Sequence, residues 1–481
     1  MDIEKIRRIR TIKVLIVDLI MTISVVVIVA ILVAAVAGWR INSDFTVEQN
    51  GLVSIKTRPT GASVNIDDSE QFQTSNMSKM LTGGEHKIAI QKEGYESWEK
   101  TITVTPGWLY RLEYPRLFKQ DREKEELRTY ANLNFFYVSP DRSAAIYAKE
   151  NTTEWTLVTN FNGNLKYEDI DIQGLFTNTE NGEFKYKIKH LEWNENNERI
   201  LVNVSNDKLD EWGIISLNTA QKSINISNDF SDLKDISDAK FEDSSGKGVL
   251  ALAENKIIRL DLNSKSMTKI LDDVESFNFR DNEIIYLENK SDGRKIKLYH
   301  IGDEKAVDVS DVDNDKTVAL ALTKFNSQNY LLYTNNNRIF VYRAADYPRS
   351  GSNFNMSLIN ENDLGIIPTE VVVSKNNEFI VFREGSRVVV YDAELEIWNE
   401  YDYGDEKVRF LDDFLLYRVD SASKKFLTWD FDSSNVRTLV VDCGNNSFDA
   451  LISENERYFY YIGSFSEEGT TYYKLIREKL Q

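Results

Sequence analysis

Residues 370–401 read EVVVSKNNEFIVFREGSRVVVYDAELEIWNEY, and in this stretch short apolar runs alternate with polar turns. The runs are Glu370 to Val373, Glu378 to Phe382, Arg387 to Tyr391 and Ile397 to Tyr401. Runs of this length that are rich in valine, isoleucine and aromatic residues and bounded by Asn, Gly and charged residues predict β-strands. The stretch therefore predicts a four-stranded sheet whose strands are buried between neighbouring sheets.

The hairpin at the centre of this stretch recurs along the chain. Each copy contains a few apolar residues, a turn rich in Asp, Asn or Ser, and a second apolar run. The copies begin at Val138, Leu191, Phe241, Phe279, Phe325, Val373, Phe410 and Ile452. A hairpin that recurs roughly every 36 to 54 residues, with a third strand after most copies, is typical of a β-propeller, whose blades bury their faces only against each other. We expect a mainly β fold with eight blades, or seven if Phe241 and Phe279 belong to one irregular blade.

The last copy lacks an outer strand. It contains the runs Ala450 to Ser453, Tyr458 to Ile462 and Tyr472 to Ile476, and the chain stops a few residues later. An unpaired outer edge is an aggregation hazard. We therefore expect Leu127 to Tyr130 to supply the missing strand and close the ring.

The N-terminal region contains a long apolar stretch. Leu19 to Trp39 has 21 residues without a charge, and at about 1.5 Å per residue it spans the hydrocarbon core of a bilayer, which is about 30 Å thick. We expect one transmembrane helix that contacts the membrane lipid bilayer through Leu19 to Trp39. Asp18 lies at the edge of this span, where its carboxylate reaches headgroups or water, so we interpret it as a boundary residue rather than a proton relay.

The basic residues flanking the span indicate its orientation. The five residues ahead of it that carry a positive charge are Lys5, Arg7, Arg8, Arg10 and Lys13, whereas Arg40 is followed by Asp44 and Glu48. The positive-inside rule then places the N-terminus in the cytoplasm and the rest of the chain outside, in the cell envelope. The alternative is a signal peptide cleaved after Ala37, because Ala35-Val-Ala37 resembles a small-residue cleavage site.

A compact all-β module follows the span. Residues 52–57 alternate at period two, and Pro59-Thr60-Gly61-Ala62 supplies a turn before the next strand, Ser63 to Ile66. Leu81, Gly84, His86 and Gly94-Tyr95 continue the pattern. At these residues the segment resembles the PEGA domain, a small β-sandwich, although the usual Asp-Gly turn reads Asp67-Asp68 here. The resemblance implies an envelope accessory domain without catalysis.

The first hairpin also resembles a known repeat. Ser139-Pro140-Asp141, followed by Ala144 to Tyr147, is similar to the Ser-Pro-Asp repeats of WD40-like, TolB-type propellers. The other copies keep the pattern but show Asn or Asp-Asp at the turn. The resemblance implies a fold and no particular ligand.

These observations divide the chain into five parts. Residues 1–18 are expected to be a basic cytoplasmic segment, 19–39 the transmembrane helix, 50–118 the PEGA-like sandwich and 127–481 the propeller. Between the last two, residues 119–126 carry seven charges in eight positions, which predicts a solvated linker or a short helical spacer.

The composition excludes one class of partner. The chain has 77 acidic and 58 basic residues and a formal net charge of −19, whereas nucleic-acid binding needs clustered Lys and Arg. We therefore expect no nucleic-acid partner. The single cysteine, Cys443, has no partner in the chain for a disulfide, and we interpret it as a buried thiol.

None of the groups that carry chemistry elsewhere forms a recognisable site. The three histidines, His86, His190 and His300, are too scattered for a zinc motif. Asp311, Asp313 and Asp315 resemble the start of a calcium loop, but Lys316 and Leu322 replace its glycine and glutamate. The adjacent carboxylates Asp272-Asp273 and Asp412-Asp413 point to opposite faces if they lie on strands.

The tryptophans of the propeller give no site either. Trp155, Trp212 and Trp429 lie on third strands, a repeated position typical of inter-blade core rather than of sugar binding. No Gly-x-Ser-x-Gly motif occurs in the chain, which excludes the peptidases that join a propeller to an α/β-hydrolase domain. We therefore expect no catalytic, cofactor-binding or metal-binding residue and no cofactor.

Three functions fit this organisation. The first is a membrane-anchored, extracytoplasmic scaffold, not an enzyme, whose propeller binds an envelope protein or a cell-wall glycan. The second is a carbohydrate-active enzyme, a glycoside hydrolase or lyase that uses carboxylates from different blades at the central funnel. The third is a structural component of a surface layer.

Overall fold

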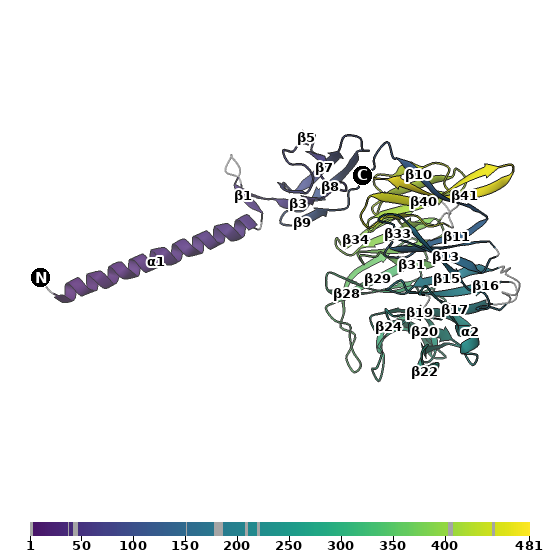
Figure 1. The fold of residues 1–481 in the computed structure, drawn as a ribbon. Helices are drawn as coiled ribbons and strands as arrows, with labels where there is room; N and C mark the ends of the chain where they lie inside the picture. The colour runs from purple at the N-terminus through teal and green to yellow at the C-terminus, as the bar shows by residue number, and fades with distance from the viewer. Residues whose placement is uncertain are drawn as a thin grey trace. The chain divides into compact units, whose positions relative to one another are not determined.

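A computed structural model describes residues 3–36, 38–41, 47–150, 152–177, 186–206, 210–218, 222–402, 407–444 and 448–481. The chain forms two compact units, Met1–Asp121 and Arg122–Gln481 (Figure 1). The first contains the apolar helix and a small β-sandwich, and the second contains the repeated hairpins.

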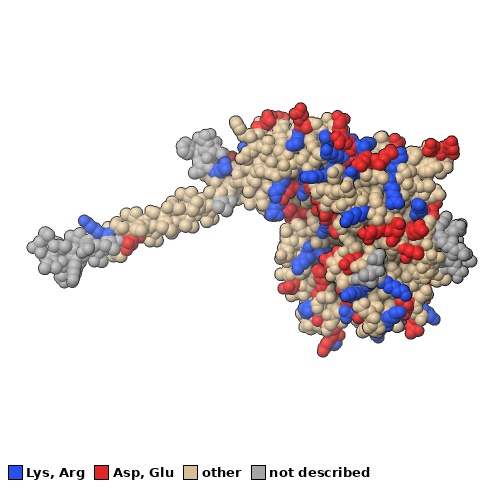
Figure 2. All heavy atoms as spheres, in the orientation of Figure 1, with Lys and Arg blue, Asp and Glu red and all other residues tan. Residues whose placement is uncertain are grey.

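Helix α1 (Ile3–Val36) contains the apolar stretch Leu15–Ala35, which has 21 residues. This stretch is long and apolar enough to cross a membrane, and a signal sequence near an N-terminus meets the same criterion. Figure 2 shows charges near the N-terminal end of the helix and an uncharged surface beyond them. Ala37, after which cleavage is the alternative prediction, lies outside the described residues.

The predicted span to Trp39 is wrong at its C-terminal end. The helix stops at Val36, and Trp39 belongs to strand β1 (Trp39–Ile41), which pairs with β2 (Val47–Gln49). Gly38 causes the change of direction, because it adopts a left-handed backbone (φ 84°) and donates its N–H to the Ala35 carbonyl (3.2 Å). A glycine in this conformation just after a helix is a common terminator.

The β-sandwich of the first unit has two sheets. One contains β6 (Met77–Leu81), β3 (Gly51–Ile55) and β9 (Leu109–Leu112), in that order, and the other contains β5 (Ser69–Glu70), β4 (Ser63–Ile66), β7 (Gly84–Gln91) and β8 (Trp98–Val104). Side chains from both sheets, among them Val53, Ile55, Val64, Ile88 and Trp98, are completely buried between them. Because alternate residues of each strand point to one face, the period-two pattern of the sequence produces this core.

The turn at Asp67-Asp68 keeps the geometry of the usual Asp-Gly turn. Both residues have positive φ values, 51° and 62°, and they connect β4 to β5. Two central residues with positive φ are characteristic of a type I′ turn, which Asp tolerates because its side chain forms local hydrogen bonds. The replacement of glycine therefore does not change the hairpin.

The second unit contains eight four-stranded antiparallel sheets in the part of the chain that the structure describes. Four of them, each given in strand order, are β11 (Leu133–Val138), β12 (Ala144–Lys149), β13 (Glu154–Thr159), β14 (Lys166–Asp171); β15 (Lys187–Trp193), β16 (Arg199–Ser205), β17 (Asp210–Ser216), β18 (Ile224–Asn225); β19 (Ile236–Phe241), β20 (Gly248–Ala253), β21 (Lys256–Asp261), β22 (Ser266–Leu271); and β23 (Val274–Arg280), β24 (Glu283–Lys290), β25 (Gly293–His300), β26 (Val307–Val312). A short helix, α2 (Ile226–Asp229), follows β18.

The remaining sheets are β27 (Leu320–Phe325), β28 (Gln328–Asn335), β29 (Arg338–Ala344), β30 (Ser357–Asp363); β31 (Glu370–Val373), β32 (Phe379–Glu384), β33 (Arg387–Asp392), β34 (Ile397–Asp402); β35 (Arg409–Phe410), β36 (Leu415–Asp420), β37 (Lys425–Asp430), β38 (Arg437–Val440); and β10 (Lys124–Ala131), β41 (Thr470–Lys479), β40 (Tyr458–Glu467), β39 (Leu451–Ile452). In seven of these sheets the predicted hairpin joins the first two strands, and in the sheet that contains β10 it joins β39 and β40. Phe241 and Phe279 lie in separate sheets, β19–β22 and β23–β26. The second unit is a β-propeller.

Hydrogen bonds within the turn explain the repeated polar residues. The Ser139 hydroxyl donates to Asp141 Oδ1 (2.6 Å) and accepts from the Ala144 N–H (3.0 Å), which closes the turn between β11 and β12. The same pair of contacts recurs at Ser374, Asn376 and Phe379 and at Ser453, Asn455 and Tyr458. Because the turn uses one side-chain oxygen as the acceptor, Asn replaces Asp without loss of the contact.

The ring closes through strand β10. Residues 124–131 pair antiparallel with β41, with Tyr130 opposite Tyr473, so the prediction that Leu127 to Tyr130 supplies the missing strand is confirmed. The strand begins earlier than expected, which corrects the linker predicted for residues 119–126. An ion pair holds the start of this strand against β41. Glu478 of β41 is completely buried and accepts a hydrogen bond from Arg122 Nε (2.6 Å).

Candidate functional site

A cavity of about 600 Å³ in the propeller is lined mainly by first strands of several sheets. We call it the channel cavity, and its walls come from β11, β15, β31, β35 and the segment before β39. First strands line the central channel of a propeller, so its blades jointly build this surface. Its volume is within the range of ligand pockets, about 300 to 1,000 Å³.

The walls combine apolar and charged side chains. Val138, Ile188, Leu191 and Val373 are among the apolar residues. The charged residues are Arg142, Lys189, Lys375, Arg383, Lys407 and Arg409, against Glu192, Glu370, Asp412, Asp413 and Asp449. Basic residues thus outnumber acidic ones here, whereas the whole chain has 58 basic and 77 acidic residues.

Two acidic groups of the cavity, Glu370 and Asp449, are held by ion pairs. Glu370 pairs with Arg383 (2.8 Å) and Lys407 (3.7 Å). Asp449 pairs with Arg409 (3.0 Å) across two sheets. Burial acts to lower the pKa of Arg409, and the neighbouring Tyr417 and Asp449 outweigh it, so this pKa is raised. Arg409 therefore stays charged.

Asp412 and Asp413, one of the predicted carboxylate pairs, have separate roles. Asp412 Oδ1 accepts from the backbone N–H groups of Phe414 (2.8 Å) and Leu415 (2.7 Å), so this carboxylate shapes the turn between β35 and β36. Asp413 pairs with Arg142 (3.6 Å). The two carboxylates are therefore not arranged as an acid and base pair.

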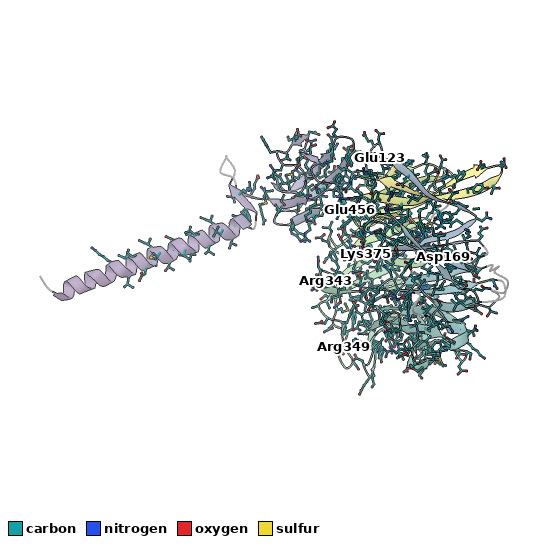
Figure 3. The ribbon with its side chains drawn as sticks, viewed as in Figure 1. Glu123, Asp169, Arg343, Arg349, Lys375 and Glu456 are labelled. Atoms are coloured by element: carbon teal, nitrogen blue, oxygen red, sulfur yellow. The ribbon has the colours of Figure 1, made fainter. Side chains whose placement is uncertain are left out.

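Three basic groups of the cavity keep unused hydrogen-bonding capacity, although Arg142 pairs with Asp413 and Arg383 pairs with Glu370. Arg142 Nε and Arg383 Nε are buried and have no hydrogen-bond partner among the described residues. Lys375, labelled in Figure 3, is exposed in the turn between β31 and β32 and has no carboxylate partner within the described ranges. Arginine N–H groups recognise carboxylates and phosphates well, so the cavity is chemically suited to an acidic group.

The other predicted candidates lie in different places. His86 is on β7 of the first unit, His190 lines the channel cavity, and His300 contacts Glu283 (2.6 Å). Asp272 pairs with Lys269 (2.6 Å). Asp311 pairs with Lys295 (3.5 Å) and Asp315 pairs with Lys316 (3.5 Å). Among the described residues, no group of three or more His, Cys, Asp and Glu could hold a metal ion.

The predicted core residues are confirmed. Trp155 and Trp429 are completely buried, and Trp212 is buried in a cluster with Val249 and Leu260 of the next sheet. Cys443 is buried, its thiol donates to the Ile462 carbonyl (3.3 Å), and burial raises its pKa to about 12. A thiol with so high a pKa is a poor nucleophile at neutral pH.

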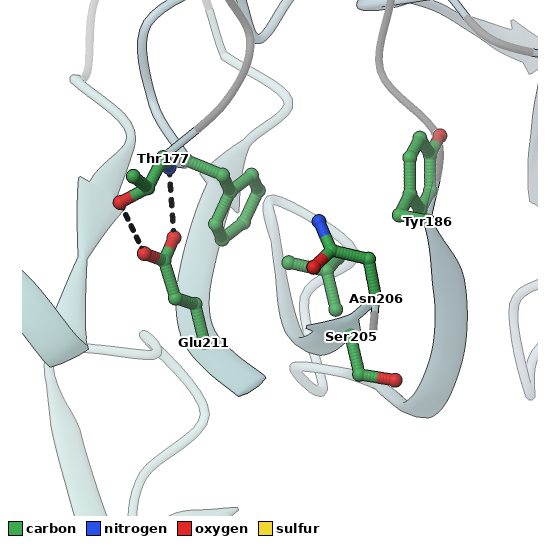
Figure 4. Close-up of a pocket in the computed structure, with 7 residues that line it drawn as sticks. Thr177, Tyr186, Ser205, Asn206 and Glu211 are labelled. Carbon is green, nitrogen blue, oxygen red and sulfur yellow. Dashed lines mark hydrogen bonds between the residues drawn. The ribbon is translucent and has the colours of Figure 1, made fainter. Parts of the chain in front are cut away.

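A second cavity is too small for a ligand. It has a volume of about 10 Å³, roughly the room for one water molecule, and Glu211 is the acidic residue that lines it (Figure 4). Glu211 accepts from the N–H (2.9 Å) and the hydroxyl of Thr177. The carboxylate is therefore used within the fold.

The basic lining of the channel cavity was missed by sequence reasoning. Lys375, Arg383 and Arg409 look like ordinary surface charges in the sequence. Lys375 lies in the turn that ends β31, whereas Arg383 lies opposite Glu370 at the start of that strand, so the position of Lys375 was the signal that the sequence offered.

Comparison with known proteins supports one domain directly. Residues 50–116 match the family model of the PEGA domain. No curated protein matches the chain. Among solved structures, the C-terminal WD40 domain of Sif2 is 10% identical, with a TM-score of 0.41, and the match covers 73% of this chain and 97% of that one.

Two other solved structures show similarity at the same level. Apo AztD from Citrobacter koseri is 12% identical, with a TM-score of 0.40 and 82% and 97% coverage of this chain and that chain. The tricorn protease is 12% identical, with a TM-score of 0.38, and the match covers 74% of this chain and 38% of that one. Residues 50–116 of this chain are a PEGA domain, which follows an N-terminal apolar helix in the sequence and precedes a C-terminal β-propeller.

Proposed function

We propose that this chain is a single-pass membrane protein whose propeller binds an acidic segment of a partner protein outside the cytoplasm. The observation that carries the proposal is the channel cavity of about 600 Å³, whose lining includes the exposed Lys375, which has no carboxylate partner among the described residues, and in which basic residues outnumber acidic ones in an otherwise acidic chain. A cavity with apolar walls and a few charged groups suits a peptide segment, because burial contributes affinity and the charges select the sequence.

The proposed location rests on the first unit. The apolar stretch Leu15–Ala35 is preceded by basic residues, which favours a cytoplasmic N-terminus for residues 1–18. The PEGA domain and the propeller then lie in the cell envelope, where the resemblance places other PEGA domains.

The carbohydrate-active enzyme is the second candidate, because carboxylates from different sheets do line one cavity. A glycoside hydrolase needs one carboxyl group as an acid and a second that is free to act as nucleophile or base. Glu370, Asp413 and Asp449 are each paired with a cation, so the observed arrangement favours binding.

The test is photo-crosslinking in intact cells that produce the full-length chain. A photoreactive phenylalanine analogue replaces Lys375 in one variant and Lys166, an exposed residue of the outer strand β14, in the control. We expect discrete adducts of higher mass from position 375 and none from position 166.

The nature of the adduct separates the candidates. A protease-sensitive adduct of one foreign protein supports the proposal. An adduct removed by a wall hydrolase identifies a glycan, and an adduct between two copies of this chain identifies a surface layer, so either result overturns it. Equal labelling from both positions, or no labelling from either, also overturns it.

A further inference from the structure

The exposed tryptophans of the described chain lie together at one end of the β-sandwich. The chain has eight tryptophans, and the exposed ones are Trp39 (46% exposed) and Trp108 (70% exposed). Leu109, next to Trp108, is 45% exposed. The remaining tryptophans are buried or partly buried, so this exposure is unusual within the molecule.

Backbone hydrogen bonds hold the loop of Trp108 next to the end of helix α1. Asn50 donates its N–H to the Gly38 carbonyl (2.9 Å), and its carbonyl accepts from the N–H of Gly107 (3.0 Å). Leu52, two residues further, donates to the Trp108 carbonyl (2.9 Å). Because Asn50 makes the hydrogen bonds to both Gly38 and Gly107, Gly107 lies within about 10 Å of Gly38.

The glycines of this region allow the close approach. A Cβ atom on Gly38 would lie 2.3 Å from the Asn50 carbonyl oxygen, a backbone atom, whereas one on Gly107 would meet only the movable end of the Gln49 side chain (2.5 Å). Both glycines also have positive φ values, 84° and 78°. The connection between the helix end and the Trp108 loop is therefore specified by the sequence.

The C-terminal end of helix α1 corresponds in position to the membrane interface. If Leu15–Ala35 fills the hydrocarbon core, Gly38 lies at headgroup level, and each headgroup layer is roughly 5 to 8 Å deep. Tryptophan is enriched at this depth because its ring is apolar and its N–H is polar. Trp108 and Leu109, which follow Gly107 and are exposed, have side chains suited to the same environment.

We propose that Trp39, Trp108 and Leu109 form a face by which the PEGA domain rests on the lipid surface. This inference depends on the proposed function, because it requires α1 to cross the membrane. The face would fix the orientation of the domain relative to the bilayer, in addition to the connection through the chain itself.

The test uses the full-length chain in liposomes, with an environment-sensitive fluorophore on an introduced cysteine. Cys443 is buried and its pKa is raised to about 12, so the introduced thiol is labelled selectively. The variants are Trp108→Cys and Leu109→Cys. The matched control is Phe72→Cys, because Phe72 is fully exposed and precedes Asn76, which bonds to Ile55 at the opposite end of β3.

We expect blue-shifted emission at positions 108 and 109, quenching by lipids that carry a quencher near the headgroup, and loss of most iodide quenching. Position 72 should remain water-like. If iodide quenches the labels at positions 108 and 109 as strongly as the label at position 72, the inference is overturned. It is also overturned if the labels at 108 and 109 are shielded from iodide but are not quenched by the lipid-borne quencher. Alkaline carbonate extraction separates the two proposals, because release of the chain from the membrane contradicts the transmembrane helix itself.

Discussion

At the residue scale, His86 and Asp67 form the clearest titratable pair of the PEGA domain. His86 Nδ1 contacts Asp67 Oδ2 (2.6 Å), and its Nε2 contacts the Thr82 carbonyl (2.9 Å). Burial acts to lower the pKa of His86, but these two acceptors outweigh it, so the pKa is raised. The hydrogen bond from His86 lowers the pKa of Asp67, because it stabilises the carboxylate.

These shifts have a defined sign for stability. The charged His86 contributes stability that is complete below the unfolded pKa of about 6.5 and is lost as the pH rises through the raised folded pKa. The charged Asp67 contributes stability above its unfolded pKa of about 3.9, which is lost as the pH falls through the lowered folded value. The pair therefore stabilises the domain most between about pH 4 and pH 6.5.

An NMR titration of the ectodomain measures the first shift directly. We expect the imidazole of His86 to titrate above pH 6.5, and Asp67→Asn to lower its pKa because the acceptor charge is removed. Asp68→Asn is the control, since it removes a neighbouring charge in the same turn and has the same left-handed backbone. An equal decrease in both variants would contradict the specific pair.

At the element scale, strand β10 determines whether the ring is sealed. It covers β41, and the ion pair between Arg122 and the buried Glu478 fastens the strand at its start. The other seven sheets are each built from consecutive strands, whereas this sheet joins the two ends of the propeller.

Deletion of β10 tests the closure. A fragment of residues 132–481 should aggregate or melt far below one of residues 119–481, because each lost backbone hydrogen bond costs about 0.5 to 1.5 kcal/mol and a domain has only about 5 to 15 kcal/mol of stability. Equal melting temperatures of the two fragments would show that the ring does not need this strand.

A point variant in the longer fragment confirms the origin of the effect. Arg122→Ala should cost about 1.5 to 3 kcal/mol in a denaturant titration, because it removes a charged hydrogen bond to Glu478, which keeps Lys124 (3.3 Å) and the Tyr461 hydroxyl (2.9 Å) as partners. Lys269→Ala breaks the exposed pair with Asp272 and should cost about 0 to 1 kcal/mol.

At the scale of the whole molecule, the helix and the folded units differ in the charge of their surfaces. The formal net charge is −19, and Figure 2 shows acidic and basic groups interspersed on the propeller but no charge along most of the helix. A surface of this kind keeps the folded part in water, whereas the helix is suited to lipid.

Protease protection tests the topology that this division implies. Protease added to intact cells stripped of their wall should digest the chain after Arg40 and spare a tag at Met1. The physical reason is the basic segment ahead of the span, which is retained on the cytoplasmic side. A tag at Gln481 is the matched control, and its protection would contradict the proposed orientation.

Local patterns of the sequence by themselves determined which secondary-structure elements this protein forms. The apolar stretch, the alternating strands of the PEGA domain and the repeated hairpins are visible in the chain because burial of one face imposes a period on the residues. The seal by residues 127–130 also followed from the missing outer strand. The end of the helix at Gly38 and the start of β10 within the charged segment were placed wrongly.

The tertiary structure alone decided which residues form the two proposed binding surfaces. Arg142 meets Asp413 and Arg409 meets Asp449 although long stretches of chain separate each pair, and Gly107 meets Asn50 in the same way. A strand pattern shows that a residue lies on one of two faces, but the pairing register and the closing of the ring decide which side chains share a cavity. The basic lining of the channel and the exposed tryptophan face therefore appear only after the sheets are assembled.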